Sequence, residues 1–207
     1  MAQSLFITVE GIDGCGKSTQ AGLIADALET AGRDVLRLRE PGGIEISEQI
    51  RAILFDPENG EMGDVCELLL YEAARAQLVH QVIEPALAAG RTVVCDRFYD
   101  STTAYQAFAD GLDRDMVAQA NELAVNGCRP DLTFVFDVPV EEAYRRRSGR
   151  GAEDRLELKG GAFQEKVAAG FRAIAAEEPA RVKLIDAARS VEEVFADVSA
   201  ELRAVGA

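Results

Sequence analysis

The stretch Leu5–Thr19, with the sequence LFITVEGIDGCGKST, joins an apolar strand-like run to a glycine-rich loop and the beginning of a helical pattern. The loop reads GxxxxGKS, a motif that is specific when it stands between a strand and a helix, as it does here. Gly11 and Gly16 let the backbone turn tightly and aim its N–H groups inward, and the helix start adds a positive dipole end. The stretch therefore predicts a loop that binds nucleotide phosphates, rather than a glycine-rich turn that ends by chance in Lys-Ser.

The same loop supplies candidate side chains. Lys17 is expected to reach the β- and γ-phosphates and to act in catalysis, and the Ser18 hydroxyl is expected to ligate Mg²⁺ bound with ATP. For Cys15, a small residue that fills the loop is favoured over a redox role, because free cysteines are commonly buried. The predicted nucleotide-binding residues are Gly11, Ile12, Asp13, Gly14, Cys15, Gly16, Lys17, Ser18 and Thr19.

Five apolar runs alternate with stretches of helical periodicity along the chain. The runs are Leu5–Val9, Val35–Leu38, Thr92–Cys95, Leu132–Phe136 and Val182–Ile185. The helical stretches are Ser18–Ala31, Ile46–Leu54, Gly63–Ala89, Arg114–Val125, Glu141–Arg147, Gly161–Glu178 and Val191–Val205. Short runs that are apolar on both faces are typical of covered parallel strands, so we expect a doubly wound α/β fold with a five-stranded parallel sheet. The 207 residues suit a single domain, 1–207, with its ligands at the carboxyl ends of the strands.

The charge and composition disfavour several classes of protein. A net charge of −14 is a poor match for a nucleic-acid binder, which usually carries a basic surface. No apolar run approaches the length that crosses a bilayer, and no basic segment precedes the first run, so we expect a cytoplasmic enzyme without a membrane partner. Four scattered cysteines and the single histidine, His80, form no readable zinc site.

An acidic and a basic residue follow the third predicted strand. Asp96 stands where a carboxylate can hold Mg²⁺, directly or through water, and Arg97 can bind a phosphate through two parallel hydrogen bonds. Asp137, after the fourth strand, is the rival metal ligand, but it lacks an adjacent arginine and precedes Val138-Pro139. The alternative for Asp96 and Arg97 is a local ion pair at the strand end.

Five of the eighteen arginines lie in the segment 145–155, among glycines. Like charges oppose helix formation and glycines add mobility, so the pattern predicts a lid at about 145–160 that closes over ATP and brings arginines to the transferring phosphoryl group. Arg147 and Arg150 are the candidate catalytic arginines, although spacing does not identify which one approaches that group. The alternative is a solvated basic helix end with the acidic partners Glu153, Asp154 and Glu157.

A phosphate-binding loop alone does not distinguish a kinase from a GTPase switch or a motor ATPase. The guanine-reading NKxD element of GTPases is absent, because Asn59, Asn121 and Asn126 are followed by Gly, Glu and Gly. Motor ATPases usually carry a longer chain. A small-molecule kinase is therefore favoured, and a regulatory nucleotide-binding protein is the alternative.

Motifs in the same order along nearly the whole chain resemble those of the bacterial thymidylate kinases. Besides the phosphate loop, Arg39–Gly43 (REPGG) resembles the most specific marker of that family. Tyr71–Arg75 (YEAAR), Asp96–Phe98 (DRF) and Arg150–Arg155 (RGAEDR) resemble its other signatures. The resemblance implies a P-loop kinase architecture, ATP-dependent phosphorylation of dTMP to dTDP for the dTTP supply, and a homodimer.

The resemblance also implies roles for residues around the sugar and phosphate of the acceptor. Arg51 and Arg97 would hold the 5′-phosphate, and Asp13 would lie near the sugar 3′-OH. Tyr105 would crowd the 2′ position and so favour deoxyribose. Because Gly14 is not basic, the chain resembles the subgroup whose catalytic arginine comes from the lid.

Four further residues would surround the acceptor base. Tyr71, where the family usually has Phe, would stack on thymine, and Arg75 would hydrogen-bond the base edge. Ser101 and Thr102 would sit beside the base. Taken alone, Tyr71 could be a core residue, since leucines occupy 68–70 of the same helix, but an arginine four residues on shares its helix face and favours a binding role.

A phosphorylated acceptor needs no base from the protein. Its second phosphate pKa is about 6, so it is already an anion at neutral pH. The remaining work is to position two anions, to screen their repulsion and to stabilise charge on the moving group. A deoxynucleoside kinase, the alternative together with another nucleoside monophosphate kinase, would attack with a neutral hydroxyl and would benefit from a carboxylate base.

Overall fold

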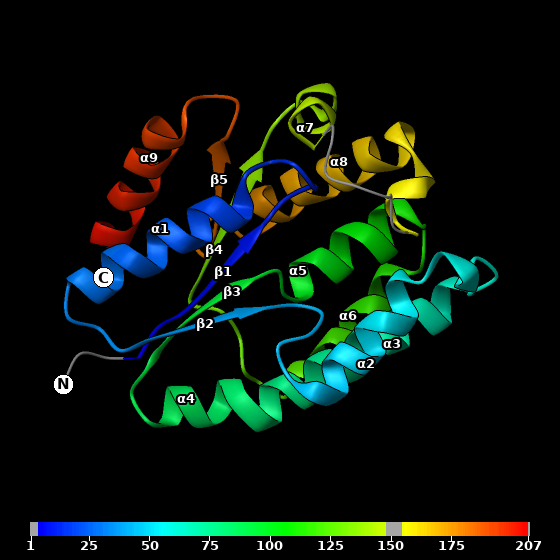
Figure 1. Cartoon of the computed structure of the whole chain (residues 1–207), viewed down its shortest axis with the longest axis horizontal. Coiled ribbons are helices and arrows are strands. Elements are labelled where there is room, and N and C mark those ends of the chain that lie inside the picture. Colours follow the sequence, from blue (N-terminus) through cyan, green and yellow to red (C-terminus); the bar gives the residue numbers. More distant parts are fainter. Residues whose placement is uncertain (1–3, 148–154, 207) are drawn as a thin grey trace.

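A five-stranded parallel sheet forms the centre of the computed structural model, which describes residues 4–147 and 155–206 (Figure 1). The strand order is β2-β3-β1-β4-β5, and all four pairings are parallel. The strands are β1 Phe6–Glu10, β2 Val35–Arg39, β3 Thr92–Asp96, β4 Leu132–Asp137 and β5 Val182–Asp186. The predicted α/β class and all five predicted strands are confirmed, each boundary to within one residue.

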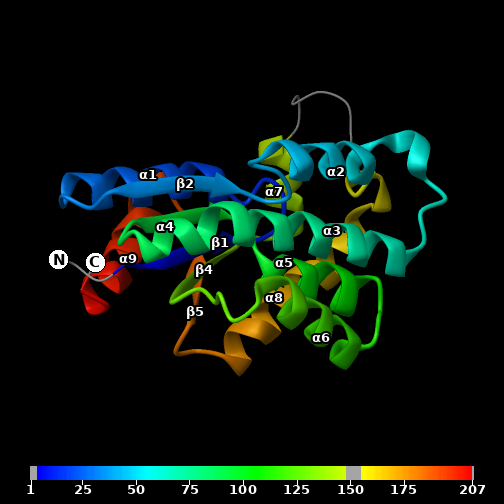
Figure 2. The same cartoon turned by 90° about the horizontal axis from the view of Figure 1, so that it is seen from below.

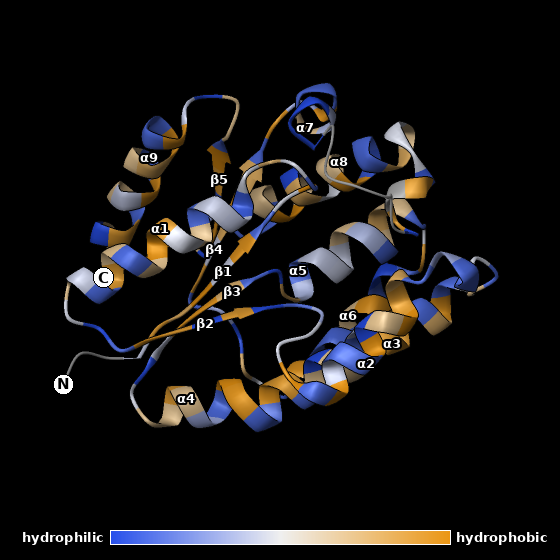
Figure 3. Cartoon of the chain, in the orientation of Figure 1, coloured by the Kyte–Doolittle hydropathy of each residue, from blue (hydrophilic) through white to orange (hydrophobic). Residues whose placement is uncertain are grey.

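Helices cover both faces of the sheet, as the alternating pattern predicted. On one face, α1 (Lys17–Thr30) packs against α9 (Val191–Ala204). On the other face, α4 (Glu84–Ala88) contacts β3, and α8 (Gly161–Glu177) contacts β4 and β5. Figure 3 shows apolar residues concentrated in the strands between these two layers.

The remaining helices gather near the carboxyl ends of the strands (Figures 1 and 2). There α2 packs on α3, and α3 packs on α6. Among the described residues, none of the helices is both long and apolar enough to span a bilayer. The bounds are α2 Glu45–Phe55, α3 Asp64–Leu78, α5 Tyr99–Thr102, α6 Arg114–Val125 and α7 Val140–Arg147, with short 3₁₀ turns η1 Pro57–Asn59 and η4 Glu157–Lys159.

Two of the helical regions contain a π-helical segment. The predicted helix Gly63–Ala89 is a continuous run of α3, the π-helical segment η2 (Val79–Ile83) and α4. A second run, α5 followed by the π-helical segment η3 (Thr103–Ala109), was not predicted from the sequence. Ser, Thr and Tyr dominate its first turns and have weak intrinsic helix propensity, so tertiary packing rather than local sequence stabilises this run.

Gly170 allows α8 to pack closely on the unpredicted helical run. A Cβ atom added at Gly170 would lie 2.9 Å from Phe108 Cβ and 3.2 Å from Ala104 Cα. The contact leaves no room for a methyl group without a shift of one helix. This small residue thus brings α8 close to η3, which carries residues of the candidate site described below.

Gly170→Ala is therefore expected to destabilise the protein by about 1–3 kcal/mol, because an extra methyl group overpacks the contact. Gly22→Ala in α1 is the matched control: nothing lies within 4 Å of its added Cβ, so better helix propensity should stabilise the protein by up to about 1 kcal/mol. The midpoints of urea unfolding measure both effects. Equal midpoints for the two variants would contradict the close contact.

Candidate functional site

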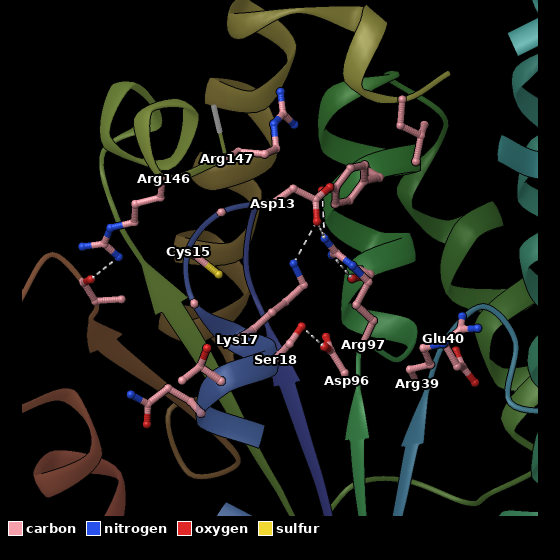
Figure 4. A pocket seen from close by; sticks show the side chains of 18 of the residues that line it. Asp13, Cys15, Lys17, Ser18, Arg39, Glu40, Asp96, Arg97, Arg146 and Arg147 are labelled. Atoms are coloured by element: carbon pink, nitrogen blue, oxygen red, sulfur yellow. Dashed lines mark hydrogen bonds and ion pairs between the residues drawn. The ribbon is translucent and has the colours of Figure 1, made fainter. Parts of the chain in front are cut away.

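A large pocket opens at the carboxyl ends of β1 and β3, with a volume of about 1420 Å³. Ligand pockets of about 300–1,000 Å³ hold one drug-sized molecule, so this pocket has room for two nucleotides. Its walls come from the loop after β1, the REPGG loop after β2, α3, the α5–η3 run, α7 and the loop after β5. These walls bring together the loops that the sequence analysis selected (Figure 4).

The loop after β1 needs glycine at two positions for steric reasons. Gly11 has φ 137° and Gly14 has φ 93°. An added Cβ would lie 2.7 Å from the Phe136 carbonyl oxygen at Gly11 and 2.3 Å from the Ala143 carbonyl oxygen at Gly14. Both contacts are with backbone that cannot move aside, so any side chain would open the loop.

Two cations, Lys17 of the phosphate loop and Arg97 after β3, converge on the Asp13 carboxylate (Figure 4). Lys17 Nζ lies 2.9 Å from Asp13 Oδ1, and Arg97 Nη2 lies 2.7 Å from the same oxygen. Burial alone would raise the pKa of Asp13, but the charges of Lys17 and Arg97 hold it well below its ordinary value. Two cations from the ends of two neighbouring strands therefore point to one spot in the pocket.

Ser18 and Asp96 form a second pair beside them. Ser18 Oγ donates to Asp96 Oδ2 at 2.5 Å, and Asp96 Oδ1 is buried without a hydrogen-bond partner among the described residues. A hydroxyl and a carboxylate with an unused oxygen form a hard-oxygen donor set that fits Mg²⁺. The rival Asp137 does not line the pocket, and its Oδ2 accepts from Arg172 at 2.8 Å.

Arg97 has a left-handed backbone, with φ 73°, which is uncommon for a residue other than glycine. Its guanidinium donates to Ser101 Oγ at 2.9 Å and lies 5.4 Å from the centre of the Tyr105 ring. Such backbone strain costs about 1–3 kcal/mol and is typical of functional positions. The strain here directs the guanidinium into the pocket rather than along the strand.

The wall opposite the phosphate loop carries most of the predicted acceptor-binding residues. Tyr71 on α3 and Tyr105 on η3 both line the pocket, as do Ser101 and Thr102. Arg51 on α2 lines it as well, with its guanidinium 4.3 Å from the centre of the Phe55 ring and Nη1 donating to the Pro41 carbonyl at 2.9 Å. Every predicted acceptor-binding residue therefore lies on the wall of this one pocket.

Arg75 is in a different setting from the one that a base-binding role suggests. It is 2% exposed, and it donates to Glu40 at 2.8 Å, to Glu72 at 2.5 Å and to Thr102 at 3.0 Å. Burial raises the pKa of Glu40 to about 7, although the Arg75 charge opposes this. The arginine thus belongs to a buried ionic network at the pocket floor that joins the REPGG loop, α3 and α5.

Glu10 is a buried carboxylate behind the pocket wall that the sequence analysis did not select. It is fully buried, and it accepts from the Phe98 backbone N–H and from Ser101 Oγ, each at 2.6 Å. Burial and the neighbouring Asp100 raise its pKa to about 8, against the opposing charge of Arg97. The available signal was a carboxylate that ends an apolar strand directly before the glycine loop.

The predicted lid, about 145–160, is described only in part. Arg150 lies in the segment 148–154, outside the described residues, whereas Arg147 lies on α7 with its guanidinium 4.7 Å from the centre of the Tyr144 ring. Arg146 donates to Glu142 at 2.7 Å and to the Ala187 carbonyl at 2.9 Å. Both Arg146 and Arg147 line the pocket on the α7 side of the phosphate loop (Figure 4).

Arg155 does not line the pocket. It is buried, it forms an ion pair with Glu67 of α3, and its Nε donates to the Leu54 carbonyl at 2.9 Å. Lys159 extends this network to Asp110 at 2.7 Å. The arginine-rich segment is therefore not one continuous basic surface, because its last arginine, Arg155, is buried in an ion pair with α3.

Cys15 fills the inside of the phosphate loop. It is 2% exposed, and its Sγ would lie only 2.8 Å from a Cβ atom added at Gly11. Burial raises the pKa of its thiol, so the thiolate that redox chemistry needs is disfavoured. This setting agrees with the small filling residue favoured from the sequence.

Comparisons with known proteins agree with the geometry. Residues 9–198 match the family model described as thymidylate kinase. The thymidylate kinase of Syntrophotalea carbinolica is 49% identical over 92% of this chain and 91% of its own length, and that of Trichlorobacter lovleyi is 46% identical over 94% and 95%. A crystal structure of thymidylate kinase from Ehrlichia chaffeensis superposes with a TM-score of 0.78, at 34% identity, over 98% of this chain and 99% of that one. The chain belongs to the thymidylate kinase family.

Proposed function

We propose that this pocket transfers the γ-phosphoryl group of ATP to the 5′-phosphate of dTMP, the reaction of the family, and that the residues named above carry it. The observation that carries the proposal is the convergence of Lys17 and Arg97 on Asp13. One cation comes from the phosphate loop and the other from the strand end beside the acceptor wall. Their shared position is where a donor phosphate and an acceptor phosphate would meet.

The donor half consists of the phosphate loop and its cation site. Residues Gly11–Thr19 would cradle the ATP phosphates through backbone N–H groups and the start of α1, with Lys17 on the β- and γ-phosphates. Ser18 and Asp96 would hold Mg²⁺, and the unpartnered Asp96 oxygen supports this. The metal would supply neutralising charge to the phosphates when bound.

The acceptor half consists of α2, α3 and the α5–η3 run. Arg97 and Arg51 would hold the 5′-phosphate, and Asp13 would lie near the 3′-OH. Tyr105, which is 5% exposed, would restrict the 2′ position. The base would lie between Tyr71, Arg75, Ser101 and Thr102. Arg147 and Arg150, in a lid over about 145–160 of a single domain spanning 1–207, would approach the transferring group.

A hydroxyl acceptor fits the same pocket less well. A deoxynucleoside kinase benefits from a carboxylate that can take a proton. Asp13 is the carboxylate that Lys17 and Arg97 contact, and these two cations hold its pKa well below its ordinary value. It is therefore a poor proton acceptor. Glu10 accepts two hydrogen bonds in a fully buried position, away from the open pocket.

We further propose a homodimer in a reducing cytoplasm. The cysteines at 15, 66, 95 and 128 are all free thiols. Several large apolar side chains are exposed on the packed helices α2, α3 and α6, among them Ile53 at 47%, Val65 at 49%, Leu69 at 59% and Leu123 at 84%. Exposed apolar side chains on neighbouring helices support a contact with a second copy of the chain.

The acceptor is tested with purified protein, ATP and magnesium. ADP release should be fastest with dTMP and slower with dUMP, dCMP and AMP, and thymidine should give the slowest turnover because it lacks the phosphate that Arg51 and Arg97 would hold. A coupled spectrophotometric assay measures all five acceptors. Faster turnover with thymidine than with dTMP would show that the enzyme is a deoxynucleoside kinase instead.

The role of Tyr71 is tested by two substitutions. Tyr71→Ala should raise the KM for dTMP by roughly 10- to 100-fold, because stacking on a base contributes about 1–3 kcal/mol. The KM for ATP should stay unchanged. Tyr71→Phe keeps the ring and should behave like the unsubstituted enzyme. An unchanged KM for dTMP in Tyr71→Ala would identify the ring as a core residue.

The dimer is tested by sedimentation equilibrium. The unsubstituted chain should sediment at twice the mass of one chain, and Leu69→Asp should shift it toward the single chain, because a charge on α3 would be buried without a partner. Leu184→Asp on β5 is the control, since Leu184 is also exposed, at 47%, but lies away from α3. Dimers that persist in Leu69→Asp but not in Leu184→Asp would place the contact elsewhere.

A further inference from the structure

Gln164 is a buried glutamine whose side-chain amide is unsatisfied. It lies in the first turns of α8 and is 3% exposed. Among the described residues, neither its amide oxygen nor its amide nitrogen has a hydrogen-bond partner. Burying an amide without partners costs free energy, and each such group in a folded protein needs an explanation.

Two other buried glutamines contrast with it. Gln106 is 1% exposed, and its amide nitrogen donates to Glu67 at 2.7 Å. Gln20 is 3% exposed, and its amide nitrogen donates to the Val191 carbonyl at 3.0 Å, although its amide oxygen has no partner among the described residues. The fold therefore supplies a partner to the amide nitrogen of each of these glutamines but not to that of Gln164.

The surroundings of Gln164 contain complementary charges. Gln164 borders a narrow gap beside the main pocket that is too small to hold a water molecule. Its other lining residues come from the phosphate loop and from α7: Ile12, Asp13, Val140, Ala143, Tyr144 and Arg147. The Asp13 carboxylate is a hydrogen-bond acceptor that suits the amide nitrogen, and the Arg147 guanidinium is a donor that suits the amide oxygen. Figure 4 shows Arg147 on the opposite side of Asp13 from Arg97.

We infer that Gln164 is a positioning residue for phosphoryl transfer, which bridges Asp13 and Arg147 when both substrates are bound. Its amide nitrogen donates to the Asp13 carboxylate, and its amide oxygen accepts from the Arg147 guanidinium. The bridge satisfies both amide groups at once and sets Arg147 relative to the phosphate loop. The inference rests on the proposed function, because it gives Asp13 and Arg147 their places around the reacting phosphates.

The bridge explains why an amide occupies this position. Unpaired amide groups lower stability in the buried position of Gln164, so a residue chosen for packing alone would be apolar. An unsatisfied polar group that persists in a fold is retained for another reason, and function at the expense of stability is a common one. Activity and stability are therefore expected to change in opposite directions when the amide is removed.

The test replaces Gln164 with methionine, which has a similar length and no amide. Gln164→Met should raise Tm by about 2–4 °C, since it removes the unpaired buried groups. It should also lower kcat for dTMP phosphorylation by about 10- to 100-fold, the loss expected from a misplaced catalytic group. The KM values for ATP and dTMP should stay within about twofold. A Tm that falls, or a kcat that is unchanged, would overturn the inference.

A double-mutant cycle with Arg147→Met isolates the coupling. If Gln164 acts through Arg147, adding Gln164→Met to Arg147→Met should lower kcat by no more than about twofold further. Independent, multiplicative losses would overturn the inference. Glu165→Met, on the exposed side of the same helix, is the control and should leave kcat unchanged. Failure of the unsubstituted enzyme to phosphorylate dTMP would instead refute the proposed function, and the Tm comparison would still report on the amide.

Discussion

The Asp13 carboxylate between Lys17 and Arg97 is the interaction on which the rest of the site depends. Both cations are largely buried, with 9% and 15% of their side chains exposed, and like charges repel strongly where water is excluded. Asp13 offsets that repulsion from a loop whose shape is fixed by glycines. Two largely buried cations can therefore lie close together in this pocket.

Similar buried networks hold the walls of the pocket at fixed distances. Arg75 joins the REPGG loop to α3 and α5, and Glu67 joins α3 to Arg155 and Gln106. Buried ion pairs are weak evidence for stability, because desolvation offsets much of their attraction, but removal of one partner costs about 3–5 kcal/mol. Their contribution here is to define geometry, since each network ties together elements that are distant in sequence.

The features that were predictable from the sequence depend on local pattern. The five strands, the phosphate loop and the placing of Asp96 and Arg97 at the end of β3 all follow from apolar runs and from residues next to them in the chain. The α5–η3 run was not predictable from local pattern, because packing against α8 at Gly170 stabilises it. The burial of Arg75 and Arg155 was not predictable for a similar reason. Their partners, Glu40 and Glu67, lie 35 and 88 residues away along the chain, beyond the reach of any local pattern.

The sheet itself sets the separation of the proposed donor and acceptor sites. β1 leads into the phosphate loop and β3 into Arg97, and neighbouring strands lie about 4.8 Å apart. Val9 pairs with Asp96, and the Arg97 backbone N–H donates to the Val9 carbonyl at 2.9 Å, so the register continues past the end of β3. If the register slipped by one residue, each of these side chains would point to the other face of the sheet. Reacting atoms must lie within about 3.5 Å of each other for in-line transfer. In the proposed reaction, strand register rather than any single side chain would therefore determine whether the two phosphates can meet.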